Sequence, residues 1–222
     1  MGPMEDRSLY RYFLSNGEER IHKWVHYFDV YERHFRRFVD RAPTVFEIGV
    51  AGGGSLRMWQ NYFGADSRIV GLDINPDCKA HEREGIEIFI GSQDDPAVIE
   101  AILAKYTPDV VIDDGSHLMH HLRATFDLLY HRVHPRGVYF AEDLHTCYWP
   151  KFGGGLRKPE SFMEFVKDKL DEINACHTGG AVPVSRFTAE TAGICVYDSI
   201  VVFERAPQGK RQAPVIERMA VD

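Results

Sequence analysis

Two short stretches of the sequence place acidic side chains and a histidine directly after apolar runs. Asp114 and His117 lie in Val-Ile-Asp-Asp-Gly-Ser-His, and Glu142 and Asp143 end Val-Tyr-Phe-Ala-Glu-Asp. Both stretches are predicted to emerge at the carboxyl edge of one sheet, where open α/β folds bind their ligands. Three carboxylates that converge there repel one another unless a cation or protons neutralise them, and oxygen ligands suit Mg²⁺ or Mn²⁺ better than Zn²⁺. The pattern predicts a metal site formed by Asp114, Glu142 and Asp143, with His117 beside it as a general base.

A glycine-rich turn follows the first predicted strand. Residues 47–55 read Glu-Ile-Gly-Val-Ala-Gly-Gly-Gly-Ser. Their glycines allow the backbone to approach a ligand at the amino terminus of the next helix. A dinucleotide fingerprint beginning at Gly49 requires glycine where this chain has Ala51, so NAD is the poorer candidate ligand.

Short apolar runs alternate with stretches of helical period between residues 41 and 206. Strands are predicted at 45–50, 68–73, 86–90, 109–112 and 137–140, and helices at 55–62, 96–105, 119–131 and 160–174. Further strands are predicted at 185–187, 194–197 and 199–204, the last two joined by a tight turn at Asp198. Alternation of this kind implies right-handed crossovers and a parallel sheet. We therefore expect an α/β, Rossmann-like fold, mostly parallel, with an antiparallel hairpin at its carboxyl-terminal edge and helices on both faces.

We expect a single α/β domain with two appendages. The predicted parts are an amino-terminal helical segment at 1–40, the Rossmann-like domain at 41–206, and a tail at 207–222 that is mobile or contacts a partner subunit. Apolar residues between 17 and 40 recur at helical spacing and predict one amphipathic helix.

The composition argues against several classes of partner. The net charge of -7 disfavours binding to nucleic acid or to an anionic membrane surface. The sequence contains no apolar run of membrane-spanning length and no signal-peptide pattern, which predicts a cytoplasmic protein.

The order of the motifs resembles that of class I S-adenosylmethionine-dependent methyltransferases. In that family an acidic residue and a glycine-rich turn surround the methionine part of the cofactor, a carboxylate at the position of Asp73 binds both ribose hydroxyls, and the segment at 91–94 contacts the adenine. Two carboxylate oxygens match a vicinal diol. Adjacent strand-end residues point in opposite directions, so Asp113 is expected to face the cofactor amino group rather than the metal. The resemblance implies that S-adenosylmethionine is bound by Glu47, Gly49, Gly53, Ser55, Asp73, Gln93 and Asp113.

Within that superfamily the sequence is similar to the metal-dependent sugar O-methyltransferases of macrolide and rhamnosyl antibiotic pathways, and to cephalosporin hydroxylase-like relatives. The matching stretches lie at 22–24 with Tyr27, 46–55, 71–75, 91–94, 113–117 and 142–149. Residues at the positions of Asp114, Glu142 and Asp143 bind Mg²⁺ in that family, and a histidine at the position of His117 is the proposed base. The resemblance implies a homo-oligomeric enzyme that methylates a sugar hydroxyl of a glycosylated small molecule.

The residue types suit that reaction, although alternatives remain. A sugar hydroxyl attacks a sulfonium methyl poorly until a base removes its proton or a metal stabilises the alkoxide. A catechol-type O-methyltransferase would present an aromatic diol to the same metal. A different class would be a non-catalytic cofactor-binding protein or a metal-dependent hydrolase-like protein on the same sheet.

Several residues near the predicted site have two interpretations. His145 either contacts the acceptor or supports the site, and the loop at 148–155 either covers the acceptor or anchors itself by packing. Lys23 and Trp24 either close over the cofactor or are, respectively, a solvated residue and a core residue.

Overall fold

The computed structural model describes residues 8–215, and its centre is a seven-stranded sheet in the order β3-β2-β1-β4-β5-β7-β6. The strands are β1 Thr44–Ile48, β2 Arg68–Asp73, β3 Ile86–Ile90, β4 Val110–Asp113, β5 Val138–Ala141, β6 Thr191–Tyr197 and β7 Ile200–Arg205. The first five strands pair in parallel, whereas β7 is antiparallel to both β5 and β6. The predicted sheet with its antiparallel carboxyl-terminal hairpin is confirmed, and β7 lies between β5 and the edge strand β6.

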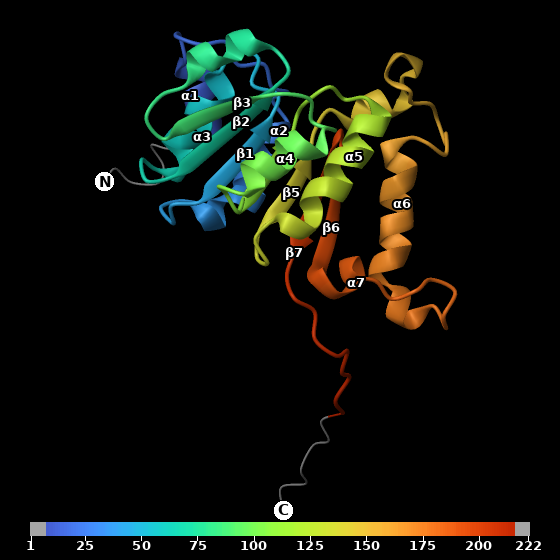
Figure 1. The fold of residues 1–222 in the computed structure, drawn as a ribbon. Coiled ribbons are helices and arrows are strands. Elements are labelled where there is room, and N and C mark those ends of the chain that lie inside the picture. Colours follow the sequence, from blue (N-terminus) through green and yellow to red (C-terminus); the bar gives the residue numbers. More distant parts are fainter. Residues whose placement is uncertain (1–7, 216–222) are drawn as a thin grey trace, which may run out of the picture.

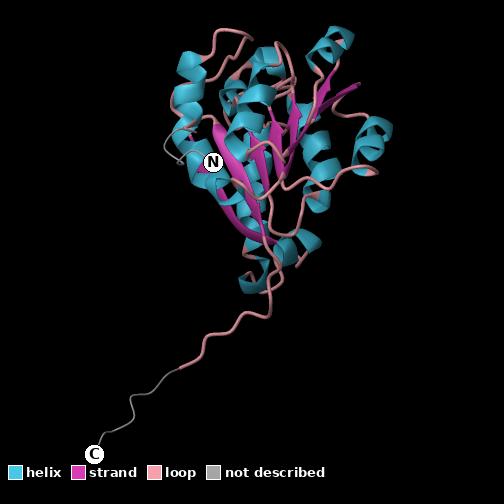
Figure 2. Cartoon of the chain, turned by 90° about the vertical axis from the view of Figure 1, so that its left-hand side faces the viewer, coloured by secondary structure: helices cyan, strands magenta, loops and turns pink. Residues whose placement is uncertain are grey.

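Helices cover both faces of this sheet, as the two orthogonal views show (Figure 1, Figure 2). The α-helices are α1 Leu9–Ser15, α2 Tyr27–Phe35, α3 Gly54–Phe63, α4 Pro96–Leu103, α5 Met119–Leu129, α6 Phe162–Ile173 and α7 Arg186–Glu190. Short 3₁₀ helices are η2 Arg36–Phe38, η3 Pro76–His81, η4 Tyr130–Arg132, η5 Leu144–Tyr148, η6 Pro150–Phe152 and η7 Ala175–His177. One apolar cluster packs α1, α2 and α3 on one face, and a second packs α4, α5, α6 and α7 on the other. Neighbouring strand residues alternate between the two clusters, as Tyr139 and Phe140 do, because side chains alternate across a strand.

The predicted helix between residues 17 and 40 is only partly present. Its helical part begins at Tyr27, and the chain before it contains no regular helix from residue 16 onward. This earlier stretch packs on the glycine-rich turn, where atoms of Arg20 and Ile21 leave no room for a Cβ on Gly52 or Gly54. Tertiary contact with that turn has therefore overridden the helical period.

The predicted strand at 185–187 is wrong, because this stretch begins helix α7. The Ser185 hydroxyl accepts a hydrogen bond from the Thr188 amide, and the Thr188 hydroxyl accepts one from the Ser185 amide. This reciprocal capping satisfies amide groups that a helix start otherwise leaves unpaired. Three residues of apolar pattern are too short to overcome it.

Beyond β7 the chain up to residue 215 forms no helix or strand and extends away from the domain (Figure 2). Residues 1–7 of the predicted helical segment and 216–222 of the predicted tail lie outside the described residues. The limits of the domain and the homo-oligomeric state stay predictions. Within residues 8–215 no helix is both long enough and apolar enough to cross a bilayer.

Candidate active site

Three of the four residues predicted to form the metal site and its base meet above the carboxyl edge of the sheet. Strands β4 and β5 are parallel neighbours, so the loops after Asp113 and Ala141 emerge side by side. Nε2 of His117 lies 3.9 Å from Oδ1 of Asp114 and 3.8 Å from Oδ2 of Asp143. One candidate ligand atom from each of these three residues lies within 4.8 Å of the others. Each side chain is about one-fifth exposed, so the group is open to a ligand.

A buried lysine lies among the carboxylates. Nζ of Lys23 is 2.6 Å from Asp114 Oδ2, 2.8 Å from Glu142 Oε2 and 3.4 Å from Glu47 Oε1. Burial lowers the pKa of Lys23, but the charges of Asp114 and Glu142 outweigh it and raise the pKa well above its ordinary value. Lys23 is therefore a buried ammonium rather than a solvated side chain, whereas the adjacent Trp24 is 49% exposed and is not a core residue.

Glu142, the fourth predicted residue, is fully buried with both oxygens engaged. Oε1 accepts a 2.8 Å hydrogen bond from the Tyr31 hydroxyl, and Oε2 accepts one from Lys23. Burial raises the pKa of Glu142 to about 8, and the charge of Lys23 opposes this rise. Glu47 is also buried and accepts a 2.6 Å hydrogen bond from the Ser55 hydroxyl. To bind a cation, Glu142 must exchange its bond with Lys23 for a bond to the metal.

The two aspartates each have one engaged oxygen and one that faces His117. Asp114 Oδ2 is held by Lys23, and Asp143 Oδ1 accepts a 2.7 Å hydrogen bond from the Tyr27 hydroxyl. The cluster of Glu47, Asp114, Glu142 and Asp143 thus has four carboxylates and a single ammonium. Converging carboxylates favour a cation or protons, so the remaining oxygens of Asp114 and Asp143 fit a hard divalent ion.

The backbone at this site adopts an uncommon conformation. His117 has φ 57° and Asp143 has φ 53°, in the left-handed region that residues other than glycine rarely adopt. Such conformations cost on the order of 1–3 kcal/mol each and persist where the surrounding structure enforces them. Their coincidence at His117 and Asp143, two of the three residues that meet above the sheet edge, supports a functional site.

Two adjacent cavities lie beside the cluster. The larger, of about 330 Å³, is lined by the glycine-rich turn together with Lys23, Asp114, His117 and Asp143. The smaller, of about 160 Å³, has a mainly apolar lining. Its side chains come from Ile48, Leu72, Asp73, Ile74, Ser92, Gln93, Ser116 and His121. Both cavities are lined by Gly49, Asp73 and Gly115, so they form one groove along the sheet edge.

Gly49 allows the ends of β1 and β4 to approach each other beneath this groove. Its φ is 95°, and a Cβ added there would lie 2.1 Å from the carbonyl oxygen of Asp114. Glycine is therefore required both by the backbone conformation and by the close approach. Gly53 caps α3 in a left-handed conformation and lines neither cavity.

Asp73 borders both cavities at the end of β2. Its carboxylate accepts hydrogen bonds of 2.9 Å from the Val50 amide, 3.0 Å from the Ala51 amide and 2.9 Å from the Asn75 amide. Burial raises the pKa of Asp73, but these amide donors outweigh burial and lower the pKa below its ordinary value. An ionised Asp73 thus orders the glycine-rich turn at the place where the cavities join.

Asp113 and Gln93 form a buried pair below the turn that carries Asp114 and His117. Asp113 accepts hydrogen bonds of 2.7 Å from the Tyr139 hydroxyl and 3.1 Å from Gln93 Nε2, and burial raises its pKa to about 7. Oε1 of Gln93 accepts a 2.8 Å hydrogen bond from the Ser116 amide. Gln93 lines the smaller cavity and Asp113 lines neither. The cofactor contacts expected of both residues stay predictions.

Sequence reasoning missed the roles of Tyr27 and Tyr31. Tyr31 counts only as an apolar position of the predicted helix, and Tyr27 only as part of a stretch that matches the family, yet their hydroxyls donate to Glu142 and Asp143, respectively. A usable signal was present, since residues four apart share a helix face and a convergent acidic cluster requires donors.

Comparison with known proteins adds to this geometry. No protein-family model matches the chain. The sequence is 44% identical over 209 residues to demethylmacrocin O-methyltransferase of Streptomyces fradiae, covering 86% of this chain and 52% of that protein. It is 43% identical over 163 residues to mycinamicin VI 2''-O-methyltransferase of Micromonospora griseorubida, covering 68% of this chain and 40% of that protein. The chain spans about half the length, or less, of these relatives.

A solved structure from the mycinamicin biosynthetic pathway is also similar. It is the methyltransferase MycE in complex with magnesium, S-adenosylhomocysteine and mycinamicin VI. The TM-score is 0.81 at 31% sequence identity, over 95% of this chain and 55% of that one. The similarity therefore extends over nearly all of the domain described above.

Proposed function

Because this chain belongs to the family of S-adenosylmethionine-dependent sugar O-methyltransferases, we propose that it transfers a methyl group to a sugar hydroxyl of a glycosylated natural product. The observation that carries this proposal is the groove that runs from the glycine-rich turn to Asp114, His117 and Asp143. The names of the relatives, which describe O-methylation of demethylmacrocin and of mycinamicin VI, support the acceptor class.

The two cavities support the placement of S-adenosylmethionine, which supplies an electrophilic sulfonium methyl. The apolar walls of Ile48 and Leu72 suit a flat base, and Gln93 adds polar groups at one side. Asp73 lines both cavities, which supports the proposal that its carboxylate accepts both ribose hydroxyls. The larger cavity, with Ser55 in its lining, then receives the methionine part.

Mg²⁺ would be held by Asp114 and Asp143. Glu142 would join them in exchange for its bond to Lys23. Carboxylate oxygens are the donors that this ion prefers. When bound, Mg²⁺ lowers the pKa of a coordinated hydroxyl and stabilises negative charge on its oxygen. Tyr27 keeps one oxygen of Asp143 oriented away from His117 and so leaves the other available.

His117 accepts the proton of the acceptor hydroxyl at Nε2 while the hydroxyl oxygen bonds to the methyl carbon. The bond between that carbon and the sulfonium sulfur breaks, and S-adenosylhomocysteine is the leaving group. That nitrogen lies 3.9 Å from Asp114 Oδ1 and 3.8 Å from Asp143 Oδ2, which supports a base directly beside the oxygens that would hold the ion. General base catalysis contributes about 10²–10⁴-fold to a rate.

The test is methyl transfer from S-adenosylmethionine in MgCl₂ to mycinamicin VI, to methyl α-L-rhamnoside and to a catechol, followed by mass spectrometry. We expect a methylated glycoside with the parent chain. His117→Ala should lower kcat by about 10²–10⁴-fold and leave the calorimetric Kd for S-adenosylhomocysteine unchanged. His177→Ala, at an exposed histidine of η7, is the matched control. Methylation of the catechol alone would favour the alternative enzyme class, and a fully active His117→Ala would refute the base.

A further inference from the structure

A chain of ring contacts leads from the amino-terminal segment to His117. Trp24 contacts His145 with ring centroids 5.7 Å apart, and His145 contacts Trp149 at 4.8 Å. Trp149 then contacts Phe152 at 6.0 Å, and Phe152 contacts His117 at 6.3 Å. We call the rings of Trp24, His145, Trp149 and Phe152 the aromatic platform.

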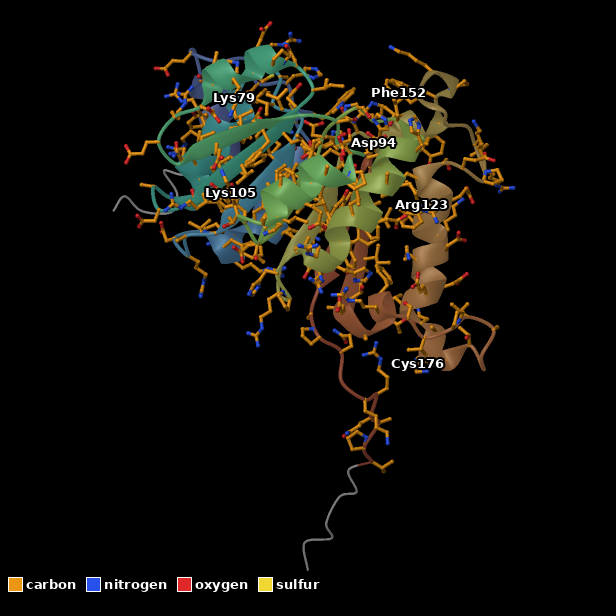
Figure 3. The ribbon with its side chains drawn as sticks, in the orientation of Figure 1. Lys79, Asp94, Lys105, Arg123, Phe152 and Cys176 are labelled. Carbon is orange, nitrogen blue, oxygen red and sulfur yellow. The ribbon has the colours of Figure 1, made fainter. Side chains whose placement is uncertain are left out.

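The platform is exposed although it consists mainly of large rings. Trp24 and Trp149 are each 49% exposed, and His145 and Phe152 are partly exposed. Figure 3 shows Phe152 near the top of the molecule, at the end of η6 in the segment that precedes α6. Exposed apolar surface beside a polar site is typical of a binding groove.

The segment that carries Trp149 and Phe152 has a well-defined backbone conformation. Backbone hydrogen bonds close it at several points, among them Gly154 N to Trp149 O at 3.1 Å and Gly155 N to Cys147 O at 2.8 Å. A Cβ on Gly154 would lie 2.4 Å from the Cys147 carbonyl oxygen, so glycine allows this tight closure. The backbone that carries these rings is therefore fixed before any ligand arrives, which lowers the entropy lost on binding.

We propose that the aromatic platform binds the acceptor glycoside, with a sugar face near Phe152 and the apolar aglycone over Trp149 and Trp24. This inference rests on the proposed function. The platform adjoins the reaction site at both ends, which identifies the acceptor as its ligand. One end contacts the ring of His117, and the other is Trp24, the residue after the buried Lys23. A glycoside pairs hydroxyls with apolar ring faces, which matches a row of aromatic rings ending at carboxylates and a base.

Trp149→Ala tests the proposal, and Tyr148→Ala is the matched control. Tyr148 is adjacent and 48% exposed, and no ring contact of its side chain occurs in the described part of the chain. Mycinamicin VI is titrated in the presence of S-adenosylhomocysteine and MgCl₂ while tryptophan fluorescence is followed. Two of the three tryptophans, Trp24 and Trp149, belong to the platform, and the third, Trp59, is fully buried. A change in tryptophan fluorescence on titration is therefore assigned to the platform. We expect Trp149→Ala to raise Kd and KM by about tenfold or more with kcat nearly unchanged, and Trp149→Phe to restore most of the affinity.

The outcomes separate this inference from the proposed function. Equal effects of Trp149→Ala and Tyr148→Ala, or no binding of mycinamicin VI and methyl α-L-rhamnoside to the parent chain, would overturn the platform. Binding weakened only by Trp149→Ala, without methyl transfer by the parent, would support the platform and refute the proposed function. Methyl transfer with an unchanged KM in Trp149→Ala would refute the platform and leave the proposed function standing. Unchanged calorimetric binding of S-adenosylhomocysteine shows that each variant is folded.

Discussion

Replacing Lys23 by methionine removes a buried positive charge with little change in side-chain length. The ammonium lies 2.6 Å from Asp114 and 2.8 Å from Glu142 and is only 3% exposed. Breaking a buried pair costs about 3–5 kcal/mol, because the partner charge is left uncompensated. Protonation limits the loss, since the pKa of Glu142 is already about 8 and rises further without Lys23. We therefore expect the free energy of unfolding at pH 7 without metal to fall by about 3 kcal/mol, the lower end of that range.

Urea unfolding measures this loss. With a slope of about 2–3 kcal/mol per molar urea, the midpoint should fall by about 1–1.5 M. Lys105→Met is the control, because Lys105 pairs with Glu87 at 2.8 Å but is 57% exposed, and exposed pairs contribute only about 0–1 kcal/mol. Equal losses in the two variants would refute the buried ammonium.

Added MgCl₂ provides a second readout of the same variant. A cation bound by Asp114 and Asp143 replaces the missing charge, so saturating Mg²⁺ should recover more stability in Lys23→Met than in the parent chain. Because the pKa of Glu142 is raised in the folded state, its contribution to the free energy of unfolding is fully present at low pH. That contribution is lost as the pH rises through the raised pKa. The metal-free variant should therefore lose stability from pH 7 to 9 more steeply than the parent. The same Mg²⁺ response in both proteins would argue against a cation site at these carboxylates.

Two further substitutions test the scaffold. Gly49→Ala should lower the free energy of unfolding by about 2–4 kcal/mol, because the added Cβ meets the Asp114 carbonyl and the φ of Gly49 is positive. Gly193→Ala is the control, because nothing lies within 4 Å of a Cβ there, and thermal unfolding should show it to be neutral or stabilising. A hydrogen bond from His34 holds the pKa of Glu204 at about 2, below its ordinary 4.5, so its contribution is present above pH 4.5 and is lost as pH falls toward 2. Glu204→Gln should reduce the difference between the free energies of unfolding at pH 5 and pH 3 by about 2 kcal/mol. Urea unfolding at the two pH values measures this difference, and the same difference in the variant and the parent chain would contradict the reasoning.

Most of the sheet could be predicted from the sequence because its strands are marked by local signals. Strands β2 and β3 have the predicted limits, and β1, β4 and β5 differ by one or two residues. Each is short and rich in apolar residues, as parallel strands covered on both faces require. The errors at residues 17–26 and 185–187 have other causes. At residues 17–26, packing of Arg20 and Ile21 on the glycine-rich turn displaces the helix. At residues 185–187, the Ser185 cap begins a helix in place of the predicted strand.

The site shows a similar division. The residue types and the spacing after β4 and β5 by themselves determined that Asp114, His117 and Asp143 share one sheet edge, because parallel neighbours end side by side. Only the tertiary structure decided which partner each carboxylate has. Lys23 lies 119 residues from Glu142 and Tyr27 lies 116 residues from Asp143, and no local pattern encodes a contact over such separations. Those long-range donors decide which oxygens are engaged and which remain available to a ligand.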